Sequence, residues 1–173
     1  PDAITSVDER TVTAETVLTL AAATSGIQPG GRLTLAAREG VYITDSMTGG
    51  ATNKALVINA DADSHGSTGT LTVASTKTVT SNDSDVTITA WDVDMSGSLT
   101  AGTKSISIHG SYASQTFGLG DASQQMQIMG SELQQMTASG GLRVGSETGG
   151  SITLNNVEKD NSNNMELVTL AAK

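Results

Sequence analysis

The residues Val86-Thr-Ile-Thr-Ala90 carry the pattern that decides the fold, because aliphatic and small polar side chains alternate and a small residue follows. Alternation with period two places the aliphatic side chains on one face of a β-strand and the threonines on the other. Similar stretches recur along the chain, and they predict strands at 17–21, 33–37, 41–44, 56–60, 71–74, 86–90, 105–109, 126–129, 142–144, 152–154 and 167–171. The sequence therefore predicts an all-β protein.

The segments between these strands are rich in residues that form turns. Clusters of Gly, Ser, Asn and Asp stand at 30–31, 49–50, 66–69, 81–84, 140–141 and 149–150. Such residues adopt positive φ angles or bond to their own backbone, so the clusters indicate corners. Short strands separated by regular corners are typical of a sandwich, a barrel or a solenoid.

Three features favour the solenoid. The dipeptides Asn-Gly and Asp-Gly, which form tight hairpins, do not occur. The chain has one Trp, two Tyr and one Phe, and of these only Trp91 suits the large buried aromatic of a sandwich. Because the strand pattern repeats, each coil can stack on a similar coil and bury a continuous core. We expect a parallel β-helix of about seven to nine coils at roughly 20 residues each, with a β-sandwich as the alternative.

One segment has helical rather than strand periodicity. Met129, Leu133 and Met136 follow helical spacing, and Ser131 with Gln134 fits a capping box. The sequence predicts a short helical turn near 131–137, at a corner of the coil, with Leu133 and Met136 packed inward.

Length and composition bound the function. The 173 residues suit a single domain, which we place at 11–173 after a lead-in or linker at 1–10. The chain starts at Pro1 without a Met, so we expect it to be a segment of a longer protein. A net charge of −9 argues against nucleic acid and anionic membrane surfaces as partners. No apolar stretch suggests membrane insertion, and the absence of cysteine excludes disulfides and thiolate chemistry.

The carboxy-terminal third resembles a known family. The residues concerned are Gly118-Leu-Gly-Asp121, Met126-Gln-Ile-Met-Gly-Ser-Glu-Leu-Gln-Gln-Met-Thr-Ala138, Gly141-Leu-Arg-Val-Gly145, Gly150-Ser-Ile-Thr-Leu-Asn155 and Leu167-Val-Thr-Leu-Ala171. They resemble a repeat unit of giant secreted, filamentous-haemagglutinin-like proteins, most closely over 115–171 and loosely over 11–171. The resemblance implies a right-handed parallel β-helix and a role in adhesion or a surface fibre, outside the cell.

Two acidic patterns are candidate sites. Asp61 and Asp63 begin like a calcium loop, but Thr72 stands where such a loop needs a bidentate Glu, so calcium is a weak candidate and a polar corner the simpler interpretation. Asp92 and Asp94 flank Val93 on one strand face, as an acid and base for glycan cleavage would. No Lys or Arg accompanies them between Lys77 and Lys104, which favours a solvated acidic face.

The Thr-x-Thr segments suggest a second kind of site. Thr70, Thr72, Thr87 and Thr89 are candidates for an outward binding face for carbohydrate or ice, although β-propensity alone explains threonine in strands. Asn82 begins a glycosylation acceptor pattern, Asn82-Asp-Ser84.

The sequence thus predicts a structural shaft of an extracellular filament or adhesin, neither catalytic nor dependent on a cofactor. Its expected partners are neighbouring coils or copies of the chain, stacked end to end because solenoid ends are unpaired edges, and cell-surface glycans are a further expectation. A carbohydrate- or ice-binding module is the alternative.

Overall fold

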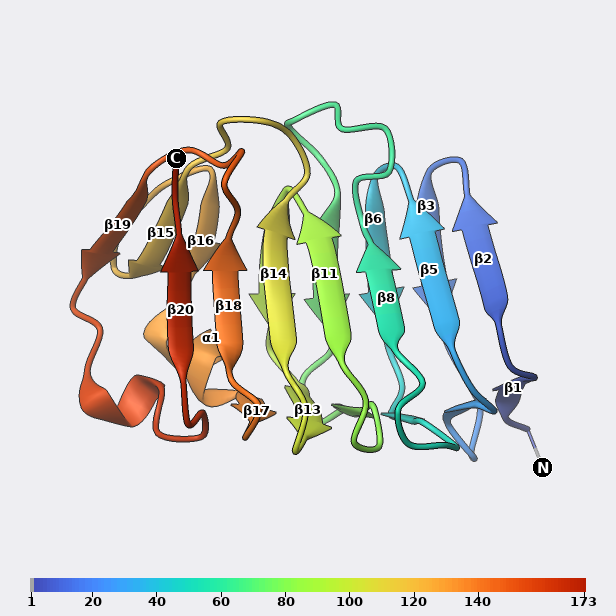
Figure 1. Ribbon diagram of the computed structural model, residues 1–173. Coiled ribbons are helices and arrows are strands. Elements are labelled where there is room, and N and C mark those ends of the chain that lie inside the picture. The colour runs from blue at the N-terminus through green and yellow to red at the C-terminus, as the bar shows by residue number, and fades with distance from the viewer. Residues whose placement is uncertain (1) are drawn as a thin grey trace.

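The computed structural model describes residues 2–173 and shows a parallel β-helix. In Figure 1 the strands of the front sheet run upward, the chain crosses the top to the back, and the coils advance from the N-terminus at the right to the C-terminus at the left, which makes the coil right-handed. Every strand pairing is parallel within the described residues, so the sandwich alternative is excluded.

The front sheet runs the length of the molecule, and each coil contributes one strand to it. Its seven strands are β2 (Arg10–Ala14), β5 (Leu33–Ala37), β8 (Leu56–Asn59), β11 (Val86–Ala90), β14 (Ile106–Gly110), β18 (Leu142–Gly145) and β20 (Val168–Ala171). Six of these seven strands were predicted, and each is confirmed to within one residue, whereas β2 was not predicted. Seven coils lie at the lower bound of the expected number, because long corner loops lengthen some coils.

The base sheet closes the bottom of each coil (Figure 1). Its strands are β1 (Ile4–Ser6), β4 (Ile27–Pro29), β7 (Met47–Thr48), β10 (Thr78–Thr80), β13 (Ser98–Gly102) and β17 (Met136–Ala138). Because β1 pairs with β4 and β2 begins at Arg10, residues 4–10 belong to the first coil. The expected lead-in at 1–10 is therefore wrong for its described part beyond Ala3.

The back of the column consists of two sheets. The first contains β3 (Val17–Leu20), β6 (Gly40–Ile43), β9 (Thr70–Val73) and β12 (Asp92–Met95); the second contains β16 (Met126–Ile128), β15 (Phe117–Gly120) and β19 (Ile152–Asn155). The later strand β16 lies between β12 and the earlier strand β15. The chain thus advances one position with β15 and returns to fill the gap with β16.

Glycine permits this return. The segment 121–125 crosses the outer face of β15, where a Cβ on Gly118 would lie 1.8 Å from the carbonyl oxygen of Ala122. No side chain fits at that position. In β15 the side chains of Phe117 and Leu119 point inward and Gly118 and Gly120 face outward, and all four residues are buried.

The helical prediction is correct in place and wrong in detail. Helix α1 spans Gly130–Gln134, while Met136 and Thr137 enter β17 beside Leu99 and Thr100. The residue before the helix is Met129, and Glu132 rather than Ser131 or Gln134 supplies the capping carboxylate. Leu133 and Met136 are buried, as expected.

Ranks of aliphatic side chains fill the interior. In the front sheet one inward rank contains Leu33, Leu56, Val86, Ile106 and Leu142 in register. A second contains Leu35, Ile58, Ile88, Ile108 and Val144. All are at most 5% exposed, so stacked coils share one dry core. The buried aromatic is Phe117, whereas Trp91, the candidate for the buried aromatic of a sandwich, lies at a corner and stacks on Tyr112 at 5.5 Å between ring centroids.

Carboxylates join neighbouring coils at the corners. Asp8 accepts the backbone amide of Arg32 and contacts Lys54; Asp45 accepts the amide of Ala22 and bonds Lys77 at 2.7 Å. Asp83 accepts the amide and hydroxyl of Thr103, and Asp85 the amide of Ser105. Hydrogen bonds lower the pKa of Asp8, Asp45 and Asp83, with Lys54, Lys77 and Thr103 as the leading donors. These four carboxylates therefore help to hold neighbouring coils together.

Candidate functional site

The two ends of the column are its most distinctive surface. Among residues 2–173, ten large apolar side chains are exposed, and eight of them lie in the first and last coils: Ile4, Val7, Val12, Val17, Leu154, Leu167, Val168 and Leu170. The other two are Tyr42 and Met129. Soluble proteins expose single apolar residues everywhere, so this concentration at two places is informative.

Five of these eight end residues occupy core positions. Val168 and Leu170 pair in register with the buried Leu142 and Val144, and Leu154 pairs with the buried Leu119. At the other end Val12 is in register with Leu35, and Ile4 with Ile27. Their side chains point along the core ranks and are exposed only because no further coil covers them. A cavity of about 80 Å³ opens at the amino-terminal end between Ile4, Val12 and Leu20.

The end strands also have free edges. Within residues 2–173, β2 pairs only with β5, and β20 only with β18. A free edge presents a row of backbone N–H and C=O groups that can pair with another strand. Each end therefore combines an apolar face with unpaired hydrogen-bonding groups, the two features that hold one coil to the next inside the column.

The expected threonine face is divided between two sheets. Thr70 and Thr72 lie on β9 at the back, and Thr87 and Thr89 on β11 at the front. All four point outward, but their neighbours in register include Tyr42, Asp94, Val57 and Asn59. The four residues therefore form no common threonine face.

A more regular threonine array lies on the base sheet, which the strand prediction did not include. Thr48, Thr80, Thr100 and Thr137 stand in register on four successive coils. Beside them Ser98 donates a hydrogen bond to the hydroxyl of Thr78 at 3.0 Å, and Ser46 accepts one from the Thr78 amide. The signal in the sequence is Ser-Met-Thr, Thr-Val-Thr and Ser-Leu-Thr at 46–48, 78–80 and 98–100.

Asp61 and Asp63, the weak calcium candidates, both contact neighbouring protein groups. Asp61 is 1% exposed, and its two oxygens accept hydrogen bonds from the Ser111 hydroxyl at 2.5 Å and the His65 amide at 3.2 Å. Asp63 points to the imidazole of His65. No group of three or more His, Cys, Asp or Glu residues within 2–173 could hold a metal ion. Asp61 instead connects two corner loops.

Asp92 and Asp94 do share a face, as predicted, and line a groove of about 270 Å³ with Gln127, Met129 and Glu132. Asp92 is not simply solvated, because it is half-buried and accepts the Gln127 amide at 3.0 Å. Burial raises the pKa of Asp92, and it raises that of Glu132, which is 4% exposed. Both oxygens of Glu132 accept backbone amides, from Met95 and Met129. Asp92 and Glu132 therefore have a structural role, because they hold backbone amides in place.

Only part of the glycosylation pattern is accessible in the folded chain, since Asn82 is half-buried and Ser84 is buried. Ser84, whose hydroxyl belongs to the acceptor pattern, is fully buried and bonds the Ala51 carbonyl and the Lys54 amide. Asn82 itself has a positive φ of 57° at the corner. We therefore expect the hydroxyl of Ser84 to be out of reach once the corner has formed.

No family model, curated protein or solved structure matches this chain. No helix within residues 2–173 has the length and apolar character that crossing a membrane requires. The resemblance to filamentous-haemagglutinin-like repeats therefore depends on the sequence motifs alone, chiefly those at 115–171.

Proposed function

We propose that this chain is a structural segment in the shaft of an extracellular filament or adhesin. The observation that carries the proposal is that core positions are exposed in both end coils. Repeat proteins that end in solvent need terminal repeats with a polar outer face. Here Val12 at one end and Leu170 at the other occupy core ranks instead, so the column suits continuation by further coils.

The interior suits a load-bearing role. Neighbouring coils are joined by parallel ladders on the front, base and back, by stacked aliphatic ranks, and by corner carboxylates such as Asp8 and Asp45. Because a coil contacts mainly its neighbours, the stability of such a column grows with the number of coils. The resemblance to filamentous-haemagglutinin-like repeats supports an extracellular setting. Because the chain has no cysteine, the fold forms without disulfides.

Rigidity along the axis tests the shaft role. The chain has no cysteine, so spin labels can be attached to the double variant Thr11→Cys/Thr169→Cys without background. The two positions lie in one outward rank of the front sheet, six strand spacings apart, which corresponds to about 29 Å between backbones. Double electron–electron resonance should give one narrow distance distribution. Thr34→Cys/Arg143→Cys, four spacings apart, is the matched control and should give a proportionally shorter distance, about 19 Å. A broad distribution for the long pair with a narrow one for the control would refute a rigid shaft.

A lattice-binding face is a second candidate, favoured by the register of Thr48, Thr80, Thr100 and Thr137 on the base sheet. Hydroxyls repeating at the coil spacing of about 4.8 Å can match a surface that repeats in the same way, such as ice or a crystalline polysaccharide. Thr80→Lys/Thr100→Lys should abolish inhibition of ice recrystallisation or retention on microcrystalline cellulose. Thr87→Lys/Thr89→Lys, on the front sheet, is the control. If neither wild-type activity is measurable, this candidate is discarded.

A further inference from the structure

The back of the column carries a set of exposed side chains that neither proposed function uses. Tyr42 stands on β6, and Met129 follows β16 and lines the groove beside Asp94. These are the two exposed large apolar side chains that lie outside the first and last coils among residues 2–173. Between them stand Thr72 on β9 and Asp94 on β12, both pointing outward and in register with Tyr42. Two polar groups are thus flanked on either side by an apolar one.

The ring of Tyr42 lies over Gly40 on its own strand. A Cβ added to Gly40 would come within 3.1 Å of the ring atom Cε2, so the missing side chain leaves room for the ring close to the sheet. Tyr42 is still 39% exposed, which leaves part of the ring open to solvent. The face of an aromatic ring carries partial negative charge and attracts the partly positive hydrogens of C–H groups. Tyr42 is therefore a platform on which a flat ligand can stack.

Hydrogen-bonding groups stand next to this platform. Asp94 is exposed, and its Oδ1 atom accepts the hydroxyl of Ser96 at 2.9 Å. A carboxylate has about four acceptor sites, so Asp94 has capacity for further donors, and its charge strengthens each bond. The groove of about 270 Å³ continues from Asp94 toward Gln127 and Met129. The face thus offers a stacking surface, a hydroxyl and a carboxylate within three neighbouring strands.

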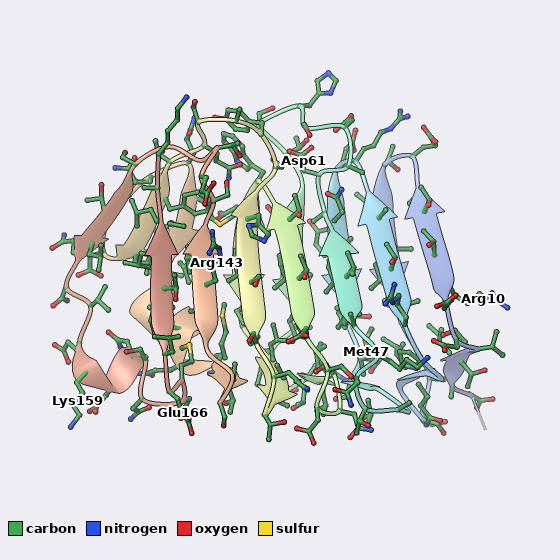
Figure 2. All side chains as sticks on the ribbon, viewed as in Figure 1. Arg10, Met47, Asp61, Arg143, Lys159 and Glu166 are labelled. Atoms are coloured by element: carbon green, nitrogen blue, oxygen red, sulfur yellow. The ribbon has the colours of Figure 1, made fainter. Side chains whose placement is uncertain are left out.

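The charge of the groove selects among ligands. Asp92, Asp94 and Glu132 line it, and no Lys or Arg is among the lining residues or pairs with these carboxylates within residues 2–173. Arg143 lies on the front sheet, on the other side of the column (Figure 2). Carboxylates without a compensating base repel uronic acids, sulfates and phosphates, but they accept hydrogen bonds from hydroxyl groups. The groove therefore complements an uncharged, hydroxyl-rich ligand.

A peptide strand has no edge to join on this face. Strand β6 lies between β3 and β9, and β9 lies between β6 and β12, so ladders engage the backbone on both sides of each strand. A ligand can therefore contact only outward side chains, and strand addition is excluded. A sugar suits such contacts, because it offers C–H groups on the face of its ring and hydroxyls at the rim. Neighbouring strands lie about 4.8 Å apart, close to the length of one sugar unit in an extended chain.

We propose that the back of the column binds a neutral, β-1,4-linked polysaccharide chain that runs along the column axis over Tyr42, Thr72 and Asp94. Equatorial linkages keep such a chain extended and leave the C–H faces of its rings free to stack on Tyr42. Thr72 and Asp94 then hydrogen-bond to the hydroxyls of the following units, and Met129 contacts the chain beyond them. The inference goes beyond the shaft function and does not depend on it.

Isothermal titration calorimetry of the full chain tests the proposal. The probes are cellohexaose, xylohexaose and mannohexaose, with hexagalacturonate as the acidic counterpart. At least one neutral probe should bind saturably, and hexagalacturonate should not. Tyr42→Ala and Asp94→Ala should each weaken binding about tenfold, through the lost stacking surface and the lost charged acceptor, whereas Tyr42→Phe should retain most of it.

A matched pair of threonine variants locates the site. Thr72→Ala should weaken binding about threefold, the effect of one lost neutral hydrogen bond. Thr87→Ala removes an equally outward threonine from the front sheet and should leave binding unchanged. Circular dichroism should show the same fold in every variant. If Tyr42→Ala does not fold, Asp94→Ala and the threonine pair carry the test.

Each other outcome overturns the proposal. Absence of binding for all three neutral probes refutes a glycan site. Binding that survives Tyr42→Ala and Thr72→Ala but is lost in Thr80→Lys/Thr100→Lys belongs to the base sheet. Hexagalacturonate that binds as tightly as the neutral probes contradicts the selection by charge. The spin-label distances are measured without any glycan, so the shaft function stands or falls separately.

Discussion

The carboxylate of Glu132 accepts the backbone amide of Met95 at 3.0 Å, although the two residues are 37 positions apart. Met95 ends β12, and no ladder joins β12 to the neighbouring β16 within the described residues. The other oxygen of Glu132 accepts the amide of Met129 at 2.8 Å, and Asp92 accepts that of Gln127. Two side chains thus satisfy the backbone where the returning strand interrupts the back sheet.

Removing this carboxylate should weaken the junction. Glu132→Ala leaves the amides of Met95 and Met129 without partners, and each buried unpaired amide costs about 1–3 kcal/mol. Glu132→Gln keeps one acceptor oxygen, so it should destabilise less. Asp94→Asn, on the exposed neighbour, should change the free energy of unfolding by under about 0.5 kcal/mol. Urea unfolding measures all three, and equal effects for Glu132→Ala and Asp94→Asn would contradict the bridging role.

Acidification should change the free energy of unfolding through two groups of carboxylates with opposite effects. Burial raises the pKa values of Asp92 and Glu132 above 3.8 and 4.5, so the folded state binds these protons more tightly and gains stability as pH falls toward those values. Hydrogen bonds lower the pKa values of Asp8 and Asp45 below 3.8, so their contribution is present above that value and disappears as pH falls through the folded-state pKa values.

The free energy of unfolding should therefore rise on mild acidification and fall on strong acidification. Glu132→Gln should reduce the rise on mild acidification and leave the fall on strong acidification unchanged. Asp45→Asn should reduce the fall and leave the rise unchanged. Urea titrations at several pH values provide the measurement. A stability that declines steadily from neutral pH, identically in wild type and Glu132→Gln, would contradict this assignment.

Gly118→Ala should disrupt the return of the chain over β15. The new methyl group would overlap the carbonyl of Ala122, which belongs to backbone that cannot rotate away. Overpacking of this kind costs typically about 1–3 kcal/mol. Gly149→Ala is the control, because its nearest neighbour lies 3.2 Å away and its φ is not in the left-handed region. Similar losses of thermal stability in the two variants would argue against a specific role for the crossing at Gly118.

Six of the seven front-sheet strands could be predicted from the sequence, because each repeats the alternation over four or five residues; β2 was not predicted. The base sheet could not, because its short strands β4, β7 and β10 contribute single large inward side chains, Ile27, Met47 and Val79. One apolar residue has no period. These strands exist because neighbouring coils place them in register.

The candidate site was predictable to a similar degree. A solenoid prediction implies that the end strands are unpaired. It does not imply the hydrogen bond between Glu132 and the backbone of Met95, because the two residues are far apart in the sequence. A signal for Arg10 was present: in Arg10-Thr-Val-Thr-Ala14 it takes the place that a leucine takes in Leu33-Thr-Leu-Ala-Ala37.

Equal truncations in the middle and at the end of the column should separate a covered rank from an uncovered one. Leu35 is fully buried and Leu170 is 38% exposed, although both occupy an inward rank of the front sheet. Leu35→Ala should destabilise the monomer by about 2–5 kcal/mol, as buried leucine truncations do. Leu170→Ala should cost the dilute monomer clearly less, because water already reaches the side chain. Thermal unfolding of the two variants gives both quantities, and equal losses of stability would contradict the difference in coverage between the middle and the end of the column.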